Sequence, residues 1–346
     1  GCLLTANGER HLKEAKRMAH SFADLPEALM NTHRLKDRID YTLENLGYRF
    51  PDFQDDDGRA MEMNEQTALL RKLTIEGAKE RGSWKNPAFR DQINREIKLI
   101  HEMKFSGYFL IVHELMLYAR AQGIFCQGRG SAANSAVCFA LKITNFDPVK
   151  HGLLFERFLS ENCETYPDID IDFPSGEKRE QVIQYLFRKY GARNAAMTAN
   201  VIRYRPRSAS REMSKVLSFP PSLADRFSSH GHSHAFHGDE KEDKSENKEE
   251  KESDFEIKIA SLIPPSHPRL KALEDLYNAV LLMPRHLGQH SGGMVICDHG
   301  LDKVVPIQPA TMPGRTVVQW DKDDCEDMGM VKIDLLGLGM LAAMEN

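Results

Sequence analysis

Acidic and apolar residues alternate strictly in one segment, and this pattern constrains the fold more than any other. The segment reads Tyr-Pro-Asp-Ile-Asp-Ile-Asp-Phe over residues 166–173. Alternate side chains of a β-strand point to opposite faces, so Asp168, Asp170 and Asp172 share one face and the apolar residues share the other. Carboxylates this close repel one another unless a cation neutralises them or protons are shared. The segment therefore predicts a strand with a divalent-metal site; the alternative is an edge strand with a solvated acidic face.

A glycine-rich turn lies upstream of this strand. Apolar residues 124–126 lead into Gln-Gly-Arg-Gly-Ser, and 132–141 are small and apolar, which predicts a strand, a turn and a helix. We expect Ser131 at the helix N-cap, with free amides and the positive end of the helix dipole facing a phosphate. Arg129 adds a guanidinium with bidentate geometry. An ordinary tight turn is the alternative, and the pattern matches neither the dinucleotide-binding nor the Walker motif.

A second strand-like run covers residues 330–338. Lys332 and Asp334 share one face of it, opposite Val331, Ile333 and Leu335. Lys332 could be only the structural partner of a buried aspartate. Combined with the turn and the acidic strand, however, the run completes the set that two-metal phosphoryl transfer needs, in which carboxylates hold the ions and amides hold the phosphates. The three motifs predict nucleotidyl transfer.

The motifs also occur in the order typical of a known family. The chain resembles the bacterial C-family DNA polymerases, the family of the DNA polymerase III alpha subunit, at residues 108–112, 128–131, 153–159, 167–173, 290–293 and 331–338. Residues 126–136, 204–209 and 285–293 resemble its error-prone, damage-inducible branch more than its replicative branch. The resemblance implies DNA synthesis from deoxynucleoside triphosphates on a primer–template.

The resemblance also implies roles for individual residues. Asp170, Asp172 and Asp334 match the catalytic aspartates, which would hold two Mg²⁺ ions, and Asp168 would support them. Gly130 and Ser131 match the element that binds the incoming triphosphate, with Arg129 beside them. Lys332 would contact a phosphate or the primer terminus.

The implied fold is α+β: a mixed α/β palm like that of the polymerase beta-like nucleotidyltransferases, with an inserted helical thumb. We expect the palm at 46–200 and 286–346 and the thumb at 201–285. Residues 1–45 resemble the end of the family's PHP domain, a phosphoesterase-like module. Both ends of the chain look cut from a longer protein. A sliding clamp and other polymerase accessory proteins would bind through regions missing here.

Basic residues cluster at the predicted start of the thumb. Arg203, Arg205 and Arg207 alternate on a segment expected to be extended, where they could follow a DNA backbone, unless this is a solvated basic loop. His290 lies four residues after His286, as in some zinc pairs, but the intervening glycine disfavours a helix. We therefore expect His290 to face DNA or phosphate.

Segment 228–254 changes abruptly to histidine, serine and charged residues with almost no apolar side chain, which predicts a disordered insertion. Its histidines could instead collect a transition metal. Residues 177–189 have the apolar spacing of an amphipathic packing helix.

Composition agrees with a large enzyme fragment. The 346 residues are 41% hydrophobic, enough for two or more domains, and the net charge of −5 does not exclude a locally basic DNA groove. Six scattered cysteines without a Cys-x-x-Cys pair predict reduced thiols in a cytoplasmic protein. There is no signal peptide or apolar run long enough to span a membrane.

Two alternatives to an error-prone polymerase differ in chemistry: a non-catalytic DNA-binding remnant, given the missing fingers, and a metal-dependent phosphohydrolase. A third is the replicative alpha subunit.

Overall fold

The structure is a computed structural model that describes residues 11–44, 46–55, 57–160, 166–230, 262–264 and 266–345. The chain divides into two compact units, Gly1–Leu46 and Gly47–Asn346. The first unit contains helices α1 (Ala15–Ser21) and α2 (Pro26–Lys36), neither of which buries a residue. The second unit contains a β-sheet, the remaining described helices and all residues of the candidate site.

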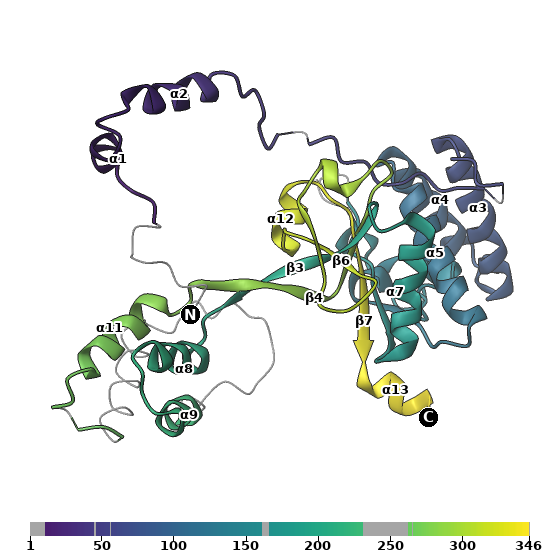
Figure 1. Cartoon of the computed structure of the whole chain (residues 1–346). Helices are drawn as coiled ribbons and strands as arrows, with labels where there is room; N and C mark the ends of the chain where they lie inside the picture. The colour runs from purple at the N-terminus through teal and green to yellow at the C-terminus, as the bar shows by residue number, and fades with distance from the viewer. Residues whose placement is uncertain are drawn as a thin grey trace. The chain divides into compact units, whose positions relative to one another are not determined.

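In the described part of the second unit, a mixed sheet of seven strands has the order β1-β2-β7-β4-β3-β6-β5. Figure 1 labels β3, β4, β6 and β7 of this sheet. The strands are β1 (Gln127–Arg129), β2 (Asp170–Pro174), β3 (Ala195–Arg203), β4 (Pro284–Ile296), β5 (Ile307–Pro309), β6 (Thr316–Val318) and β7 (Lys332–Leu338). Strand β2 pairs parallel with β7 and antiparallel with β1, and β4 pairs antiparallel with β7. This arrangement confirms the prediction of a mixed α/β fold.

The two predicted strands form at the centre of this sheet, and their apolar faces are buried as expected. Ile169, Ile171 and Phe173 are fully buried on one side of the acidic segment. On β7, Ile333 and Leu335 are also fully buried. Burying a side chain of this size contributes about 1.5–3 kcal/mol. Burial of the apolar face therefore determines which face of each strand bears the carboxylates.

Helices cover the sheet and share its main core. They are α3 (Met63–Glu80), α4 (Pro87–Glu102), α5 (Ser106–Ala121), α6 (Ala136–Ala140) and α7 (Glu177–Tyr190). The core face of α7 buries Val182, Ile183, Leu186 and Phe187, which confirms the predicted amphipathic helix. Two short helices, α12 (Lys322–Asp327) and α13 (Gly339–Glu345), flank β7 in the sequence.

The predicted helix over 132–141 is shorter and begins later. Residues Gly130–Asn134 form a 3₁₀ turn, and α6 starts only at Ala136. The prediction of Ser131 as the N-cap is therefore wrong. The cap is Ser135, whose hydroxyl accepts a hydrogen bond from the amide of Cys138. Gly130, at φ +69°, turns the chain immediately after β1, which separates Ser131 from the helix start.

Helices α8 (Pro206–Val216), α9 (Pro221–His230) and α11 (Leu270–Val280) follow β3 and precede β4. They have a separate small core of Phe219, Phe227, Ile263 and Leu273. The prediction of alternating arginines on an extended segment is wrong beyond Arg205, because Pro206 occupies the first turn of α8 and starts a helix. Arg207 is helical, whereas Arg203 ends β3.

Most of the predicted insertion at 228–254 lies outside the described residues. Only its first residues, at the end of α9, belong to the described part of the chain. The prediction of disorder and the alternative of a histidine metal site there stay predictions. The alternative in which His286 and His290 share a helical face is wrong, because both lie on strand β4.

Candidate active site

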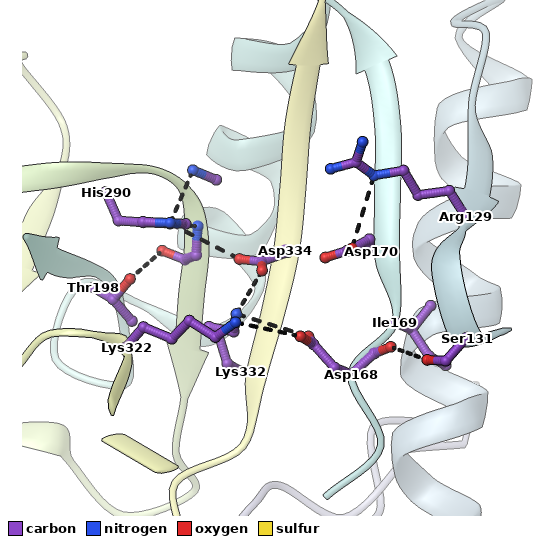
Figure 2. Close-up of polar contacts among 12 residues, drawn as sticks. Arg129, Ser131, Asp168, Ile169, Asp170, Thr198, His290, Lys322, Lys332 and Asp334 are labelled. Atoms are coloured by element: carbon purple, nitrogen blue, oxygen red, sulfur yellow. Dashed lines mark hydrogen bonds and ion pairs between the residues drawn. The ribbon is translucent and has the colours of Figure 1, made fainter. Parts of the chain in front are cut away.

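Parallel pairing of β2 with β7 brings two predicted catalytic carboxylates side by side. Asp170 is paired in register with Asp334, although the two residues lie far apart in the sequence. Strand β4 completes the arrangement from the other side, because Gly293 is paired with Asp334. Figure 2 shows Asp170 and Asp334 on adjacent strands, with Asp170 in contact with Arg129 and Asp334 in contact with Lys332 and His290.

Asp168 joins this pair more closely than Asp172 does. One carboxylate oxygen from each of Asp168, Asp170 and Asp334 lies within 4.8 Å of the others, a spacing at which the three could hold a metal ion. Asp172 is two residues further along β2, and its Oδ1 is 3.4 Å from Nε of Arg129. Asp168, Asp170 and Asp172 thus follow the predicted acidic face, and Asp334 lies beside them on β7; these four carboxylates are called the acidic row below.

Three basic side chains contact this row. Nε of Arg129 lies 3.7 Å from Oδ2 of Asp170, in addition to its contact with Asp172. Nζ of Lys332 donates a hydrogen bond of 2.5 Å to Oδ2 of Asp334 and lies 3.7 Å from Oδ1 of Asp168. Lys322, at the start of α12, lies 3.9 Å from Asp168. Lys332 is therefore a close ion-pair partner of Asp334, which matches the alternative reading of its position; its predicted contact with a phosphate stays a prediction.

Burial and mutual repulsion change the proton affinity of the carboxylates. Burial, followed by the charges of Asp168 and Asp334, raises the pKa of Asp170 to about 6. Burial also raises the pKa of Asp172, although Arg129 opposes this effect. Burial alone would lower the pKa of Lys332, but the charge and hydrogen bond of Asp334 outweigh it and the net direction is upward. The site favours binding of additional positive charge, as protons or as a cation.

Two buried oxygens support a cation as the missing partner. Oδ1 of Asp172 and Oδ1 of Asp334 are inaccessible to solvent and accept no hydrogen bond. A buried carboxylate oxygen without a donor is unfavourable, and a divalent cation satisfies it. The all-oxygen donor set is of the kind that Mg²⁺ prefers. The residues therefore fit a hard divalent ion.

The glycine-rich turn lies directly against the acidic strand. A Cβ atom at Gly130 would stand 3.7 Å from Oδ2 of Asp170. Ser131 donates a long hydrogen bond of 3.5 Å from Oγ to the carbonyl oxygen of Asp168 (Figure 2). Arg129, Gly130 and Ser131 thus border the carboxylates, as the predicted nucleotide-binding set requires.

His290 lies at the carboxylates and apart from the predicted basic cluster. Its Nδ1 accepts hydrogen bonds from the amides of Gly292 (3.2 Å) and Gly293 (2.7 Å) and lies 3.9 Å from Oδ1 of Asp334. Arg203, Arg205 and Arg207 are exposed around the junction of β3 and α8. The four predicted DNA-binding residues therefore fall into two groups.

Sequence reasoning gave no role to two residues that shape the site. Thr198 is fully buried on β3 and donates a 3.4 Å hydrogen bond to the carbonyl oxygen of Gly293. Tyr108 of α5 accepts a 3.2 Å hydrogen bond from the amide of Ile169, at the entrance to β2. The Tyr108 motif was visible in the sequence, but a single threonine on an apolar strand gave no signal.

A mixed α/β fold with carboxylates on adjacent strands and a glycine-rich turn beside them is the arrangement that the class of metal-dependent phosphoryl-transfer proteins requires. Comparison with known families makes the assignment specific. The model of the family described as "Bacterial DNA polymerase III alpha NTPase domain" matches residues 68–337. The chain belongs to this family.

Curated relatives agree with the family. The chain is 42% identical over 350 residues to the protein named "Error-prone DNA polymerase" of Bradyrhizobium sp. (strain ORS 278), covering 99% of this chain and 28% of the relative. It is 44% identical over 339 residues to the protein of the same name from Mycobacterium bovis, covering 97% of this chain and 28% of that relative. The chain thus spans less than a third of the length of these relatives. Across the part of the chain that the structure describes, no helix combines the length and apolarity needed to cross a membrane.

Proposed function

We propose that the protein containing this chain is a template-directed DNA polymerase and that this chain supplies its nucleotidyl-transfer site. The observation that carries the proposal is the pairing of Asp170 with Asp334 across β2 and β7, with the glycine-rich turn beside them. The reaction is attack of the primer 3′-hydroxyl on the α-phosphate of a deoxynucleoside triphosphate, with release of pyrophosphate.

Asp170, Asp172 and Asp334 are the proposed ligands of two Mg²⁺ ions, and the buried oxygens of Asp172 and Asp334 that accept no hydrogen bond support this choice. Bound Mg²⁺ would lower the pKa of the attacking hydroxyl and neutralise charge on the leaving pyrophosphate. Asp168 is the proposed supporting carboxylate, since it contacts both Lys322 and Lys332.

The remaining site residues orient the substrates. Gly130 and Ser131 would hold the triphosphate through backbone amides and the serine hydroxyl, and Arg129 and Lys332 would supply positive charge as the phosphates approach. His290 would face the primer or a phosphate. Arg203, Arg205 and Arg207 would contact the DNA backbone without reading sequence.

The names of the relatives support error-prone synthesis over replicative synthesis. We include damage-induced synthesis in the same proposal. We extend the proposal to the region boundaries: a palm at 46–200 and 286–346 and a thumb at 201–285. Cytoplasmic location and use of a sliding clamp through other parts of the protein belong to the same proposal.

Primer extension by the full reading frame containing this chain tests the function. Asp172→Asn should reduce extension by about a hundredfold or more, because it removes an acceptor from the metal site. Asp91→Asn, on the exposed face of α4, is the matched control and should leave the rate unchanged. A high misincorporation rate would support the error-prone branch, and a low one the replicative alpha subunit.

Two other outcomes contradict the proposal. DNA binding without extension by the wild-type protein would favour the non-catalytic remnant. Nucleotide hydrolysis without primer extension, lost in Asp172→Asn, would favour the phosphohydrolase.

A further inference from the structure

A carboxylate from within the protein already occupies the start of helix α6. Glu96, on α4, is completely buried. Its Oε1 accepts a hydrogen bond of 2.9 Å from the amide of Ala136, and its Oε2 accepts one of 3.0 Å from the amide of Val137. The free amides that a phosphate could have used at this helix are therefore engaged by Glu96.

Two side chains complete the environment of this carboxylate. The hydroxyl of Ser135 donates to Oε2 of Glu96 at 2.7 Å, and Nε2 of Gln92 donates to Oε1 at 2.9 Å. Each oxygen thus accepts two hydrogen bonds. A buried carboxylate is stable only when donors replace its water, and this set of four does so. Burial raises the pKa of Glu96, and the four donors oppose that effect.

The contacts of Glu96 continue to the turn beside the carboxylates. The amide of Ser135 donates to the carbonyl oxygen of Ala132 at 3.1 Å, and Nδ2 of Asn134 donates to the carbonyl oxygen of Ser131 at 2.9 Å. Only one 3₁₀ turn separates Ser131 from the helix that Glu96 holds. A displacement of residues 135–137 should therefore also move Gly130, because the segment between them is short and hydrogen-bonded.

We propose that Glu96 is the positioning residue of the Gly130–Ser131 turn: it fixes the start of α6 from inside the protein and thereby sets where the turn meets the triphosphate of the incoming nucleotide. This inference rests on the proposed function. The proposal also assigns phosphate binding to the Gly130–Ser131 turn itself, because the amides at the start of α6 donate their hydrogen bonds to Glu96.

The test compares Glu96→Gln with Glu102→Gln in the full reading frame. Glu96→Gln keeps the shape of the side chain but removes the charge and replaces one acceptor oxygen with an NH₂ donor, so the two donors that this oxygen served, one of them a backbone amide of α6, lose their acceptor. Glu102 ends the same helix, is exposed, and pairs only at the surface with Lys98 at 3.7 Å. Glu102→Gln is therefore the matched control.

In steady-state primer extension, Glu96→Gln should raise the KM for the nucleotide by about ten- to a hundredfold, because small misplacement of a substrate-binding group weakens binding on this scale. The affinity of Glu96→Gln for primer–template should change by less than about threefold, which is close to the error of such measurements. For Glu102→Gln, the KM, the kcat and the affinity for primer–template should all stay within the same range. A loss of kcat and DNA affinity together with KM would indicate a general packing role and would overturn the proposal.

Amide hydrogen exchange separates this inference from the proposed function. Glu96→Gln should exchange faster at residues 130–137 while β2 and β7 stay protected. Faster exchange confined to 136 and 137, with the turn unchanged, contradicts the positioning role whether or not the protein extends primers. Absence of extension by the wild-type protein would instead contradict the polymerase assignment. If Glu96→Gln fails to fold, Ser135→Ala provides the second variant, since it removes one donor to Glu96 and should shift the KM and the exchange in the same direction.

Discussion

At the scale of single residues, the acidic row is held by charge compensation. Arg129 contacts Asp170 and Asp172, and Lys332 contacts Asp168 and Asp334. Each cation therefore bridges two carboxylates. Such pairing reduces repulsion but leaves two buried carboxylate oxygens without donors, so the row keeps an affinity for further positive charge.

The raised pKa of Asp170 predicts a pH dependence of stability. The pKa of this group rises from 3.8 to about 6 on folding, so between these values the folded chain binds more protons than the unfolded chain. Without divalent metal, the contribution of Asp170 to the free energy of unfolding should fall as the pH rises through this window, and stay level above it. Thermal unfolding in a chelator, compared between wild type and Asp170→Asn, isolates this contribution. Parallel pH profiles for the two proteins would show that Asp170 titrates normally.

Gly293 should tolerate no side chain. A Cβ atom there would lie 2.4 Å from Oγ1 of Thr198 and 3.2 Å from Oδ1 of Asp334. Gly293→Ala must therefore displace Thr198 or shift β4, which also crowds Asp334; we expect a loss of about 1–3 kcal/mol in unfolding free energy and weaker Mg²⁺ binding. Urea denaturation and Mg²⁺ titration measure both effects. Gly339→Ala is the control, because a Cβ atom there meets no atom within 4 Å; an equal effect in both variants would refute the steric argument.

At the scale of elements, alternation was enough to predict strands and their buried faces, but not their neighbours. Ile169, Ile171 and Phe173 show the apolar side of β2 directly in the sequence. The pairing of Asp170 with Asp334 depends on contacts between distant segments, which no local pattern contains. The candidate metal site followed from residue chemistry and from resemblance to a family, and the structure places Asp168 closer to Asp170 and Asp334 than expected.

The wrong predictions concern segment ends. Ser131 and Ser135 are both good N-caps by residue type, and the tertiary contact of Ser135 with Glu96 favours the second. Pro206 is a helix-starting signal that the spacing of the arginines obscured. In both cases two local signals competed, and only the folded structure separates them.

The close approach of α3 to α6 gives an element-scale prediction. A Cβ atom at Gly77 would lie 2.0 Å from the carbonyl oxygen of Ala140, which is backbone and cannot rotate away. Gly77→Ala should therefore separate the helices and lower the free energy of unfolding by about 1–3 kcal/mol, despite the higher helix propensity of alanine. Chemical denaturation tests this, with exposed Glu76→Ala as the control. A stabilised Gly77→Ala protein would mean that α3 and α6 do not pack this closely.

At the scale of the whole molecule, the second unit contains everything that the proposed chemistry requires from this chain. The main core, the seven-stranded sheet and all site residues lie within Gly47–Asn346. Tyr48, two residues after this boundary, already packs against the main core of the second unit. Its hydroxyl donates a 2.8 Å hydrogen bond to the carbonyl oxygen of Ile296 and accepts one of 3.3 Å from the amide of Val331.

Tyr48 therefore links β4 to the entrance of β7, next to the strand that carries Asp334. Removing residues 1–46 should leave the unfolding midpoint and the affinity for Mg²⁺ unchanged. The reason is that all described residues of the main core lie after residue 46. Removing residues 1–50 should lower the free energy of unfolding by about 2–4 kcal/mol, because it deletes the partly buried side chain of Tyr48 with both of its hydrogen bonds. It also deletes Phe50, whose ring packs edge-on against Tyr108 at 5.7 Å.

Urea denaturation and Mg²⁺ titration of the two shortened chains provide the comparison. Equal destabilisation by both deletions would mean that residues before 47 make essential contacts. If both shortened chains were as stable as the full chain, Tyr48 would not support the β4–β7 junction on which the position of Asp334 depends.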